Sequence, residues 1–272
     1  MTEAFAFTET DRTKSKWIAK IYQDFVRETG RPRTTLRGLF YYALQRNVSD
    51  YPICGGFVGE IRITRPYHEN DGEKLAKWTK RAKTLGFIPP DAIIEEMPGC
   101  HTFLPEPGNR VLPNIEVWLN SSAAGPLLCP VCEKHGIVLV SVQGKPSQDR
   151  VADLFKRHES PTTILCLSDL TQRDAFFADE LAEDIQRFQL GEENLAISIK
   201  RIALLPEQIL KLKIPMIRAY KSKGNRDKFK KYLASYSLDP KNMGEIDALE
   251  IYYPGGIASY LDRILSELCH NQ

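Results

Sequence analysis

The chain has 272 residues, of which 42% are hydrophobic and 26% are charged, and this composition excludes a disordered protein. Its 37 Lys and Arg residues nearly balance its 35 Asp and Glu residues, so overall charge does not identify a nucleic-acid-binding protein. No apolar run approaches the roughly 20 residues that span a bilayer, and the N-terminus lacks the pattern of a signal peptide. Six scattered cysteines are typical of reduced thiols. We therefore expect no membrane partner and a cytoplasmic protein, associated with the nucleoid if it binds DNA.

Residues 1–100 have the pattern of a helical domain. Apolar residues recur at helical spacing in 14–27, in a second segment that Thr34 or Thr35 can cap, and in about 73–85. Residues 57–63 alternate like a strand. Several helices with a short strand pair favour a winged-helix-like DNA-binding domain.

Residues 101–272 alternate predicted strands with predicted helices. The strands are expected at 115–119, 136–142, 163–167 and 195–203, and the helices at 123–135, 148–157 and 174–190, with a last amphipathic helix at 257–268. This alternation predicts an α/β domain in which a mostly parallel sheet is flanked by helices.

Polar residues follow two of these strands, Asn120–Ser121 and Ser168–Thr171, and ligands of open parallel sheets bind at such strand ends. Together with Arg37-Gly38-Leu39-Phe40-Tyr41 they resemble the topoisomerase VI A-subunit family. Further segments carry the same resemblance in order: 86–93, 115–123, 164–171, 200–204, 207–208 and 247–249. The family joins a winged-helix domain with a nucleophilic tyrosine to a Toprim domain that holds magnesium. The resemblance implies these two domains, at 1–100 and 101–272, and a homodimer or an ATPase partner subunit.

The chain departs from the acidic motif of that family. Members typically have Glu then Lys after the first Toprim strand and Asp-x-Asp after a later one, whereas this chain has Asn120, Ser121, Asp169 and Thr171. Only Asp169 remains of three expected acids. An amide and a hydroxyl are poor replacements for carboxylates as ligands of magnesium.

Without that metal, nothing neutralises the attacked phosphate and the departing sugar oxygen. We therefore expect a degenerate Toprim-like domain with no metal site and no cofactor. The alternative is a site rebuilt with Asp174 or Glu116, in which case magnesium is the cofactor.

Tyr41 matches the position of the family's nucleophile. Helical spacing places it beside Arg37 and away from the apolar stripe of its helix, so we expect an exposed phenol next to a guanidinium. Such a pair could face a phosphate, and without metal Tyr41 would serve only as a DNA contact. The alternative is a surface tyrosine packed on the stem of Arg37.

Cys129-Pro130-Val131-Cys132 followed by His135 has the spacing of a zinc or redox motif. A structural zinc usually needs a second ligand pair, for which Cys100-His101 is the only nearby candidate. A buried helix is the favoured interpretation. The five histidines show no recognisable spacing from carboxylate or serine partners, so no catalytic role is predicted for them.

Two basic segments are candidates for DNA contact. The helix at about 73–85 offers Lys77, Lys80 and Arg81 as phosphate contacts. The segment 218–231 offers Lys221, Lys223 and Arg226, with Tyr220 and Phe229 available for stacking on a base or sugar. Arg37, beside Tyr41, is a further candidate for phosphate contact. A solvated helix face is the alternative for the first. Acidic residues in 179–184 would balance these basic segments, so the total charge is nearly neutral although basic and acidic residues lie on different parts of the surface.

The leading hypothesis is a relative of the topoisomerase VI A subunit that binds double-stranded DNA without cutting it. One alternative is an active magnesium-dependent enzyme, either a transesterase that uses Tyr41 or a Toprim nuclease that uses Asp169. The other is a non-catalytic scaffold for protein interactions. These differ in DNA cleavage and in the salt dependence of DNA binding.

Overall fold

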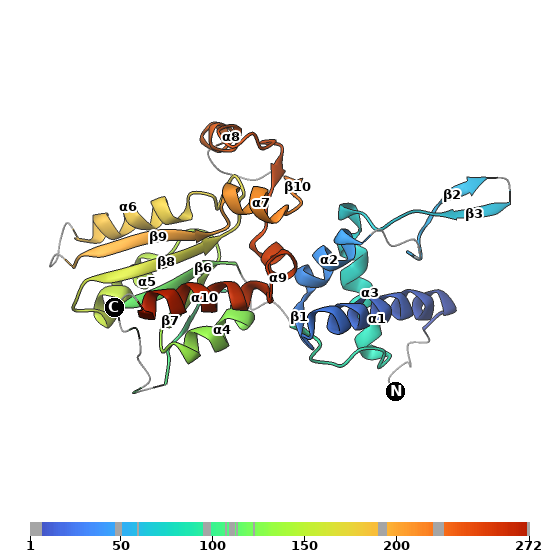
Figure 1. Ribbon diagram of the computed structural model, residues 1–272, viewed down its shortest axis with the longest axis horizontal. Coiled ribbons are helices and arrows are strands. Elements are labelled where there is room, and N and C mark those ends of the chain that lie inside the picture. Colours follow the sequence, from blue (N-terminus) through green and yellow to red (C-terminus); the bar gives the residue numbers. More distant parts are fainter. Residues whose placement is uncertain are drawn as a thin grey trace. The chain divides into compact units, whose positions relative to one another are not determined.

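The computed structural model describes residues 7–46, 51–58, 60–94, 99–106, 108, 112, 114–121, 123–189, 195–219 and 226–270, apart from the side chains of 54–58 and 61–64. The chain forms two compact units, Met1–Glu95 and Glu96–Gln272 (Figure 1). Within the described ranges, every helix is too short or too polar to cross a membrane.

The first unit contains three helices and short strands. In chain order these are α1 (Glu9–Thr29), β1 (Thr34–Thr35), α2 (Leu36–Gln45), β2 (Cys54–Val58), β3 (Ile61–Thr64), η1 (Glu69–Asp71), α3 (Gly72–Thr84) and β4 (Ile93–Ile94). The three predicted helices are confirmed. The predicted short strand pair is present as the antiparallel hairpin of β2 and β3, which lies between α2 and α3 in the sequence. Residues 57–63, predicted to alternate like one strand, are divided between these two strands.

Local chemistry explains how two of these helices begin and pack. Thr35 is the N-cap of α2, and its hydroxyl accepts a 2.8 Å hydrogen bond from the amide of Gly38. Trp17 of α1 and Trp78 of α3 meet edge to face, with ring centroids 6.0 Å apart. Both rings are buried, so this contact joins α1 to α3.

The second unit is built on a five-stranded sheet in the order β5-β7-β6-β8-β9. Its strands are β5 (His101–Phe103), β6 (Ile115–Asn120), β7 (Val138–Val142), β8 (Thr162–Ser168) and β9 (Ile197–Ala203). β5 is antiparallel at one edge, and the other four strands are parallel, which confirms the predicted mostly parallel sheet. In chain order, β7 is added beside β6 on the side of β5, whereas β8 and then β9 are added on the other side of β6. The direction in which strands are added therefore reverses between β6 and β8.

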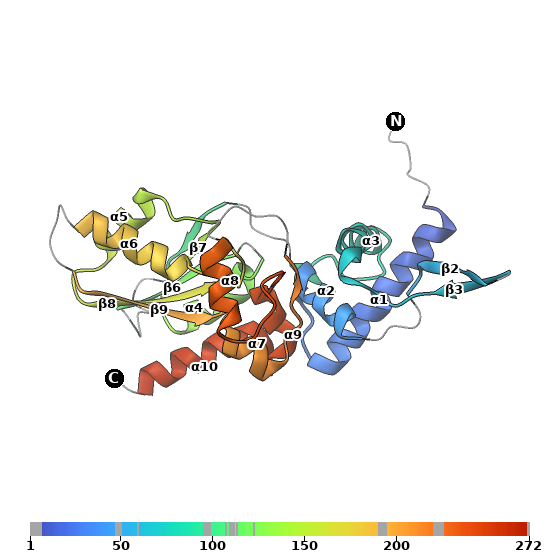
Figure 2. The ribbon, with the colours of Figure 1, turned by 90° about the horizontal axis from the view of Figure 1, so that it is seen from above.

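Helices cover both faces of this sheet. The helices of this unit are α4 (Gly125–Lys134), α5 (Gln148–Arg157), α6 (Phe177–Gln189), α7 (Pro206–Leu212), α8 (Arg226–Ala234), α9 (Leu249–Tyr252) and α10 (Gly256–His270), of which α4, α5, α6 and α10 lie on the faces of the sheet (Figure 1). Short elements β10 (Ile217–Arg218), β11 (Asn242–Met243) and η2 (Ile246–Ala248) lie near the C-terminal helices. Figure 2 shows α7, α8 and α9 gathered at the end of the sheet where β9 finishes.

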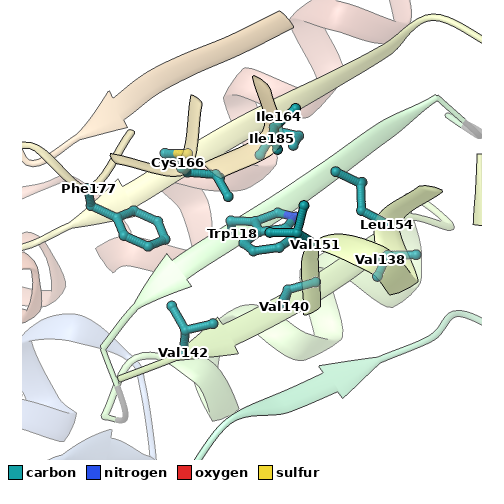
Figure 3. Close-up of a cluster of buried hydrophobic side chains, with 11 residues drawn as sticks. Trp118, Val138, Val140, Val142, Val151, Leu154, Ile164, Cys166, Phe177 and Ile185 are labelled. Atoms are coloured by element: carbon teal, nitrogen blue, oxygen red, sulfur yellow. The ribbon is translucent and has the colours of Figure 1, made fainter. Parts of the chain in front are cut away.

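The main core lies between the sheet and helices α5 and α6. Trp118 of β6 has no exposed surface and packs with Val140, Val151 and Phe177 (Figure 3). Burying each such side chain stabilises the fold by about 1.5–3 kcal/mol. Side chains alternate along a strand, so Leu119 and its neighbours pack on the opposite face, where α4 and α10 lie (Figure 1).

Candidate functional site at the carboxyl edge of the sheet

The carboxyl ends of β6 and β8 meet at the point where the strand order reverses. Asn120 and Ser168 are partners in the register of these two strands, and each is the last residue of its strand. Ligands of open parallel sheets bind at this kind of crevice. The residues that follow each strand at this edge therefore form the candidate site.

Asn120, Thr171 and Asp174 make one hydrogen-bonded network. Asn120 Nδ2 donates to Asp174 Oδ1 at 3.0 Å, and the Thr171 hydroxyl donates to Asp174 Oδ2 at 2.7 Å. The Thr171 hydroxyl in turn accepts from the Asp174 amide at 3.0 Å, while Asn120 Oδ1 accepts from the Gly144 amide at 2.8 Å. Both carboxylate oxygens of Asp174 thus have neutral donors, and Asn120 and Thr171 hold this carboxylate in place.

The turn after β7 supplies the backbone donor of this network. Gly144 has a φ of +82°, a conformation that side-chain-bearing residues rarely adopt. The guanidinium of Arg173 also occupies the space that a Cβ at Gly144 would need. Glycine is therefore required here for the backbone amide to reach Asn120.

Asp169 follows directly after β8 at the same edge of the sheet. Its carboxylate accepts a 2.8 Å hydrogen bond from the amide of Ile246. Burial raises the pKa of Asp169 well above its usual value, and the nearby carboxylates of Glu245, Asp247 and Asp174 raise it further. Both effects make Asp169 harder to ionise than an exposed carboxyl group.

Arg201 of β9 ties the loops of the edge together. Its guanidinium donates to the carbonyls of Ala175 at 2.5 Å and Leu204 at 2.6 Å, and it lies 3.5 Å from the carbonyl of Asp169. Burial lowers the pKa of Arg201. The side chain is committed to backbone carbonyls, so it positions the loop that carries Asp169.

These residues do not fit a magnesium ion. Among the described residues, no group of three or more His, Cys, Asp or Glu side chains is placed to hold a metal. Asp174 lies in the site, as the alternative with a rebuilt centre required, but its oxygens are already bonded by Asn120 and Thr171. Glu116 is at the other end of β6, where Arg157 and His158 bind it, so its proposed role as a replacement ligand is wrong.

Tyr41 is buried rather than exposed. Its side chain has 0% of its surface accessible, and its ring lies edge to face against Phe40, with the centroids 5.2 Å apart. The predicted proximity to Arg37 is present, since the guanidinium carbon lies 5.7 Å from the ring centroid. The same guanidinium lies closer to Phe40, at 4.2 Å. The expectation of an exposed phenol is therefore wrong, because the aromatic packing of α2 encloses it.

The basic helix α3 retains only part of its predicted patch. Arg81 pairs with Asp11, and Lys83 donates to the carbonyl of Ile93 at 2.8 Å. Lys77 and Lys80 are exposed, and within the described part of the chain neither makes an ion pair. These two lysines are the available cations of α3.

The second basic segment is only partly described. Tyr220, Lys221 and Lys223 lie outside the described residues, while Arg226 is exposed at the start of α8. Phe229 is 2% exposed, so the expectation that it stacks on a base or sugar is wrong. It forms part of the buried face of α8.

The Cys-x-x-Cys segment forms helix α4, as the favoured interpretation predicted. Cys132 is buried, and burial raises the pKa of its thiol. His135 instead contacts α10, with its Nε2 atom 2.7 Å from Asp262 Oδ1. The histidines show no recognisable sequence spacing from carboxylates, and His135 and Asp262 are 127 positions apart, so no local spacing reveals this pair.

A cavity of about 420 Å³ borders the candidate site, between the turn after β7 and α6. Lys145, Asp184 and Arg187 are among the residues that line it. Lys145 lies 3.0 Å from Asp184, and Arg187 lies 3.1 Å from the same carboxylate. Arg187 also bonds Glu183 at 3.2 Å, so the two cations face two carboxylates, which weakens the cavity as an anion site.

Comparisons of the chain with protein families, with curated proteins and with solved structures find no match.

Proposed function

We propose that this chain binds double-stranded DNA without cutting it, as a degenerate relative of the topoisomerase VI A subunit. In this proposal the first unit is winged-helix-like, the second is Toprim-like, and the chain acts as a homodimer or with an ATPase partner subunit. The observation that carries the proposal is the network at the carboxyl edge. Asn120 and Thr171 donate hydrogen bonds to both oxygens of Asp174, and among the described residues no group of three or more His, Cys, Asp or Glu side chains is placed to hold a metal.

Exposed cations in both units support the binding part of the proposal. Lys77 and Lys80 are one helical turn apart on α3, so they can follow neighbouring phosphates. Arg226 at the start of α8 is also exposed. Arg37 and Arg81 are the weaker candidates, since each contacts groups of its own unit.

Salt-dependent binding to a fluorescent duplex tests this surface. We expect the affinity of the full chain to fall steeply as salt rises, because phosphate contacts release counterions. The double variant Lys77→Gln with Lys80→Gln should reduce the slope of log affinity against log salt by about 0.9 per lysine. Lys156→Gln is the matched control, because this exposed lysine of α5 already pairs with Asp153 at 3.0 Å. Absence of binding at low salt would contradict the proposal and favour the scaffold.

Cleavage is the second candidate function, and a specific observation favours it. Asp169, Asp174, Glu245 and Asp247 are close enough for the other three to raise the pKa of Asp169, so acidic groups do converge at this edge. Incubation with supercoiled plasmid and magnesium or manganese separates the two candidates. We expect the plasmid to remain intact. Nicking that disappears in Asp169→Asn would establish a nuclease, and a covalent DNA adduct that disappears in Tyr41→Phe would establish a transesterase.

A further inference from the structure

A cysteine, a histidine and an aspartate converge where α10 packs on α4, away from the carboxyl edge of the sheet. Cys269 Sγ lies 3.9 Å from His135 Nδ1, and His135 Nε2 lies 2.7 Å from Asp262 Oδ1. Asp262 and Cys269 are seven residues apart on α10, so they share one face of the helix. His135 follows directly after α4, which lies beside α10 (Figure 1).

The geometry defines which nitrogen of His135 can accept a proton. Asp262 holds an ionised carboxylate, because hydrogen bonds from Lys134 and His135 lower its pKa. With its proton on Nε2, His135 donates a hydrogen bond to the carboxylate of Asp262, and the lone pair of Nδ1 is then directed toward the thiol of Cys269. A nucleophile, a base and a group that orients the base is the arrangement that activates thiols in enzymes.

We propose that Cys269 is a nucleophilic thiol that undergoes exchange with small disulfides, with His135 as its base and Asp262 as the residue that positions the base. In the exchange the thiol proton moves to His135 Nδ1, and Cys269 Sγ forms a bond to one sulfur of the disulfide. The original sulfur–sulfur bond breaks, and the departing thiolate takes the proton from His135. The products are a mixed disulfide on Cys269 and one free small thiol.

The other described cysteines provide internal references. Cys100 is exposed, whereas Cys269 is only partly exposed, so faster reaction at Cys269 would reflect activation rather than access. Cys129 lies on α4, where burial raises the pKa of its thiol and the nearby carboxylate of Glu133 raises it further. Cys129 should be the slowest of the three.

The experiment treats the full chain at neutral pH with the aromatic disulfide dithionitrobenzoate and follows each cysteine by peptide mass spectrometry. We expect Cys269 to react at least about tenfold faster than Cys100, a modest effect for a positioned base. His135→Gln retains a donor near Asp262 but lacks a base, so it should lower the rate at Cys269 by about tenfold. His270→Gln is the matched control, because this exposed histidine adjoins Cys269 and bonds the carbonyl of Ser266.

Equal rates at Cys269 and Cys100 in the unaltered chain would overturn the proposal, whether or not the variants fold. An unchanged rate at Cys269 in a folded His135→Gln variant would overturn it as well. DNA binding is not involved in this readout, so the outcome is independent of the function proposed for the carboxyl edge.

Discussion

The pKa values of the buried carboxyl groups at the two ends of the parallel sheet are shifted in opposite directions. At the amino end, Glu116 is fully buried, yet its pKa is lowered, because hydrogen bonds from His158, Arg157 and Trp118 outweigh the cost of burial. At the carboxyl end, the pKa of Asp169 is raised by burial and by neighbouring carboxylates. Burial acts in the same direction on both groups, so the partners decide which one carries a charge.

The contrast suits different roles for the two acids, a structural role for Glu116 and a role in ligand binding at the carboxyl edge. Glu116 stands four residues before Asn120 on β6, about 13 Å away along an extended strand. Its charge is matched by a cation and two further donors, which is an arrangement for stability. The carboxyl edge instead holds Asp169, whose pKa is raised by burial and by neighbouring carboxylates, an arrangement that is more typical of a site for ligands.

The largest effect is expected from breaking the amino-end network. Glu116→Gln removes the charge that Arg157 Nε reaches at 2.7 Å, and it should lower the free energy of unfolding by about 3–5 kcal/mol at neutral pH. The pKa of Glu116 is lowered in the folded state, so its contribution is complete above the unfolded value near about 4.3 and is lost as pH falls through the folded value. Urea unfolding at several pH values measures this.

A matched control for this variant is Glu183→Gln. Glu183 bonds Arg187 at 3.2 Å on the exposed side of α6, where an ion pair contributes at most about 1 kcal/mol. Equal losses in the two variants would show that the amino-end network has no special role in stability.

A smaller loss is expected from Asn120→Asp at the carboxyl end. The new carboxylate still accepts from Gly144, but it replaces the donor that reaches Asp174 Oδ1 with a like charge. We expect a loss of about 1–3 kcal/mol in the free energy of unfolding. Magnesium should restore part of the loss, because two adjacent carboxylates suit a hard cation. Thermal unfolding with and without magnesium measures both effects.

Asn114→Asp is the control, since Asn114 near the opposite end of β6 only accepts a 3.0 Å bond from Ser160 and an aspartate can do the same. Its stability should change by less than about 0.5 kcal/mol. Stabilisation of the unaltered chain by magnesium at the carboxyl edge would contradict our view that its residues do not fit the metal.

The sequence predicts the sheet better than it predicts the contacts across it. The apolar run of β8 and the helical stripe of α2 are local patterns, so both elements and the position of the strand ends could be recognised. The predicted start of α6 at 174 is three residues early, because Thr171 and Asp174 form a turn before Phe177. The three-residue strand β5 is too short to show alternation.

The chemistry of the sites depends on contacts between distant residues. Asn120 meets Asp174 across 54 positions, and Cys269 meets His135 across 134. No local spacing encodes these pairs, so a motif comparison could locate the carboxyl edge but could not show which atoms are already bonded there. The burial of Tyr41 is another such property, since it depends on aromatic neighbours from several elements.

An effect of the opposite sign is expected at Asp169. Its folded pKa is raised by burial and by neighbouring carboxylates, so the ionised side chain destabilises the protein progressively as pH rises from the unfolded value of about 3.9 through the folded value. Asp169→Asn removes that penalty while it still accepts from the amide of Ile246. The variant should match the unaltered chain at about pH 4 and should become progressively more stable than the unaltered chain as pH rises. Urea unfolding at a series of pH values from about 4 upward tests this. A variant that is less stable at high pH would mean that Asp169 has a cationic partner, and the contrast between the two ends of the sheet would then fail.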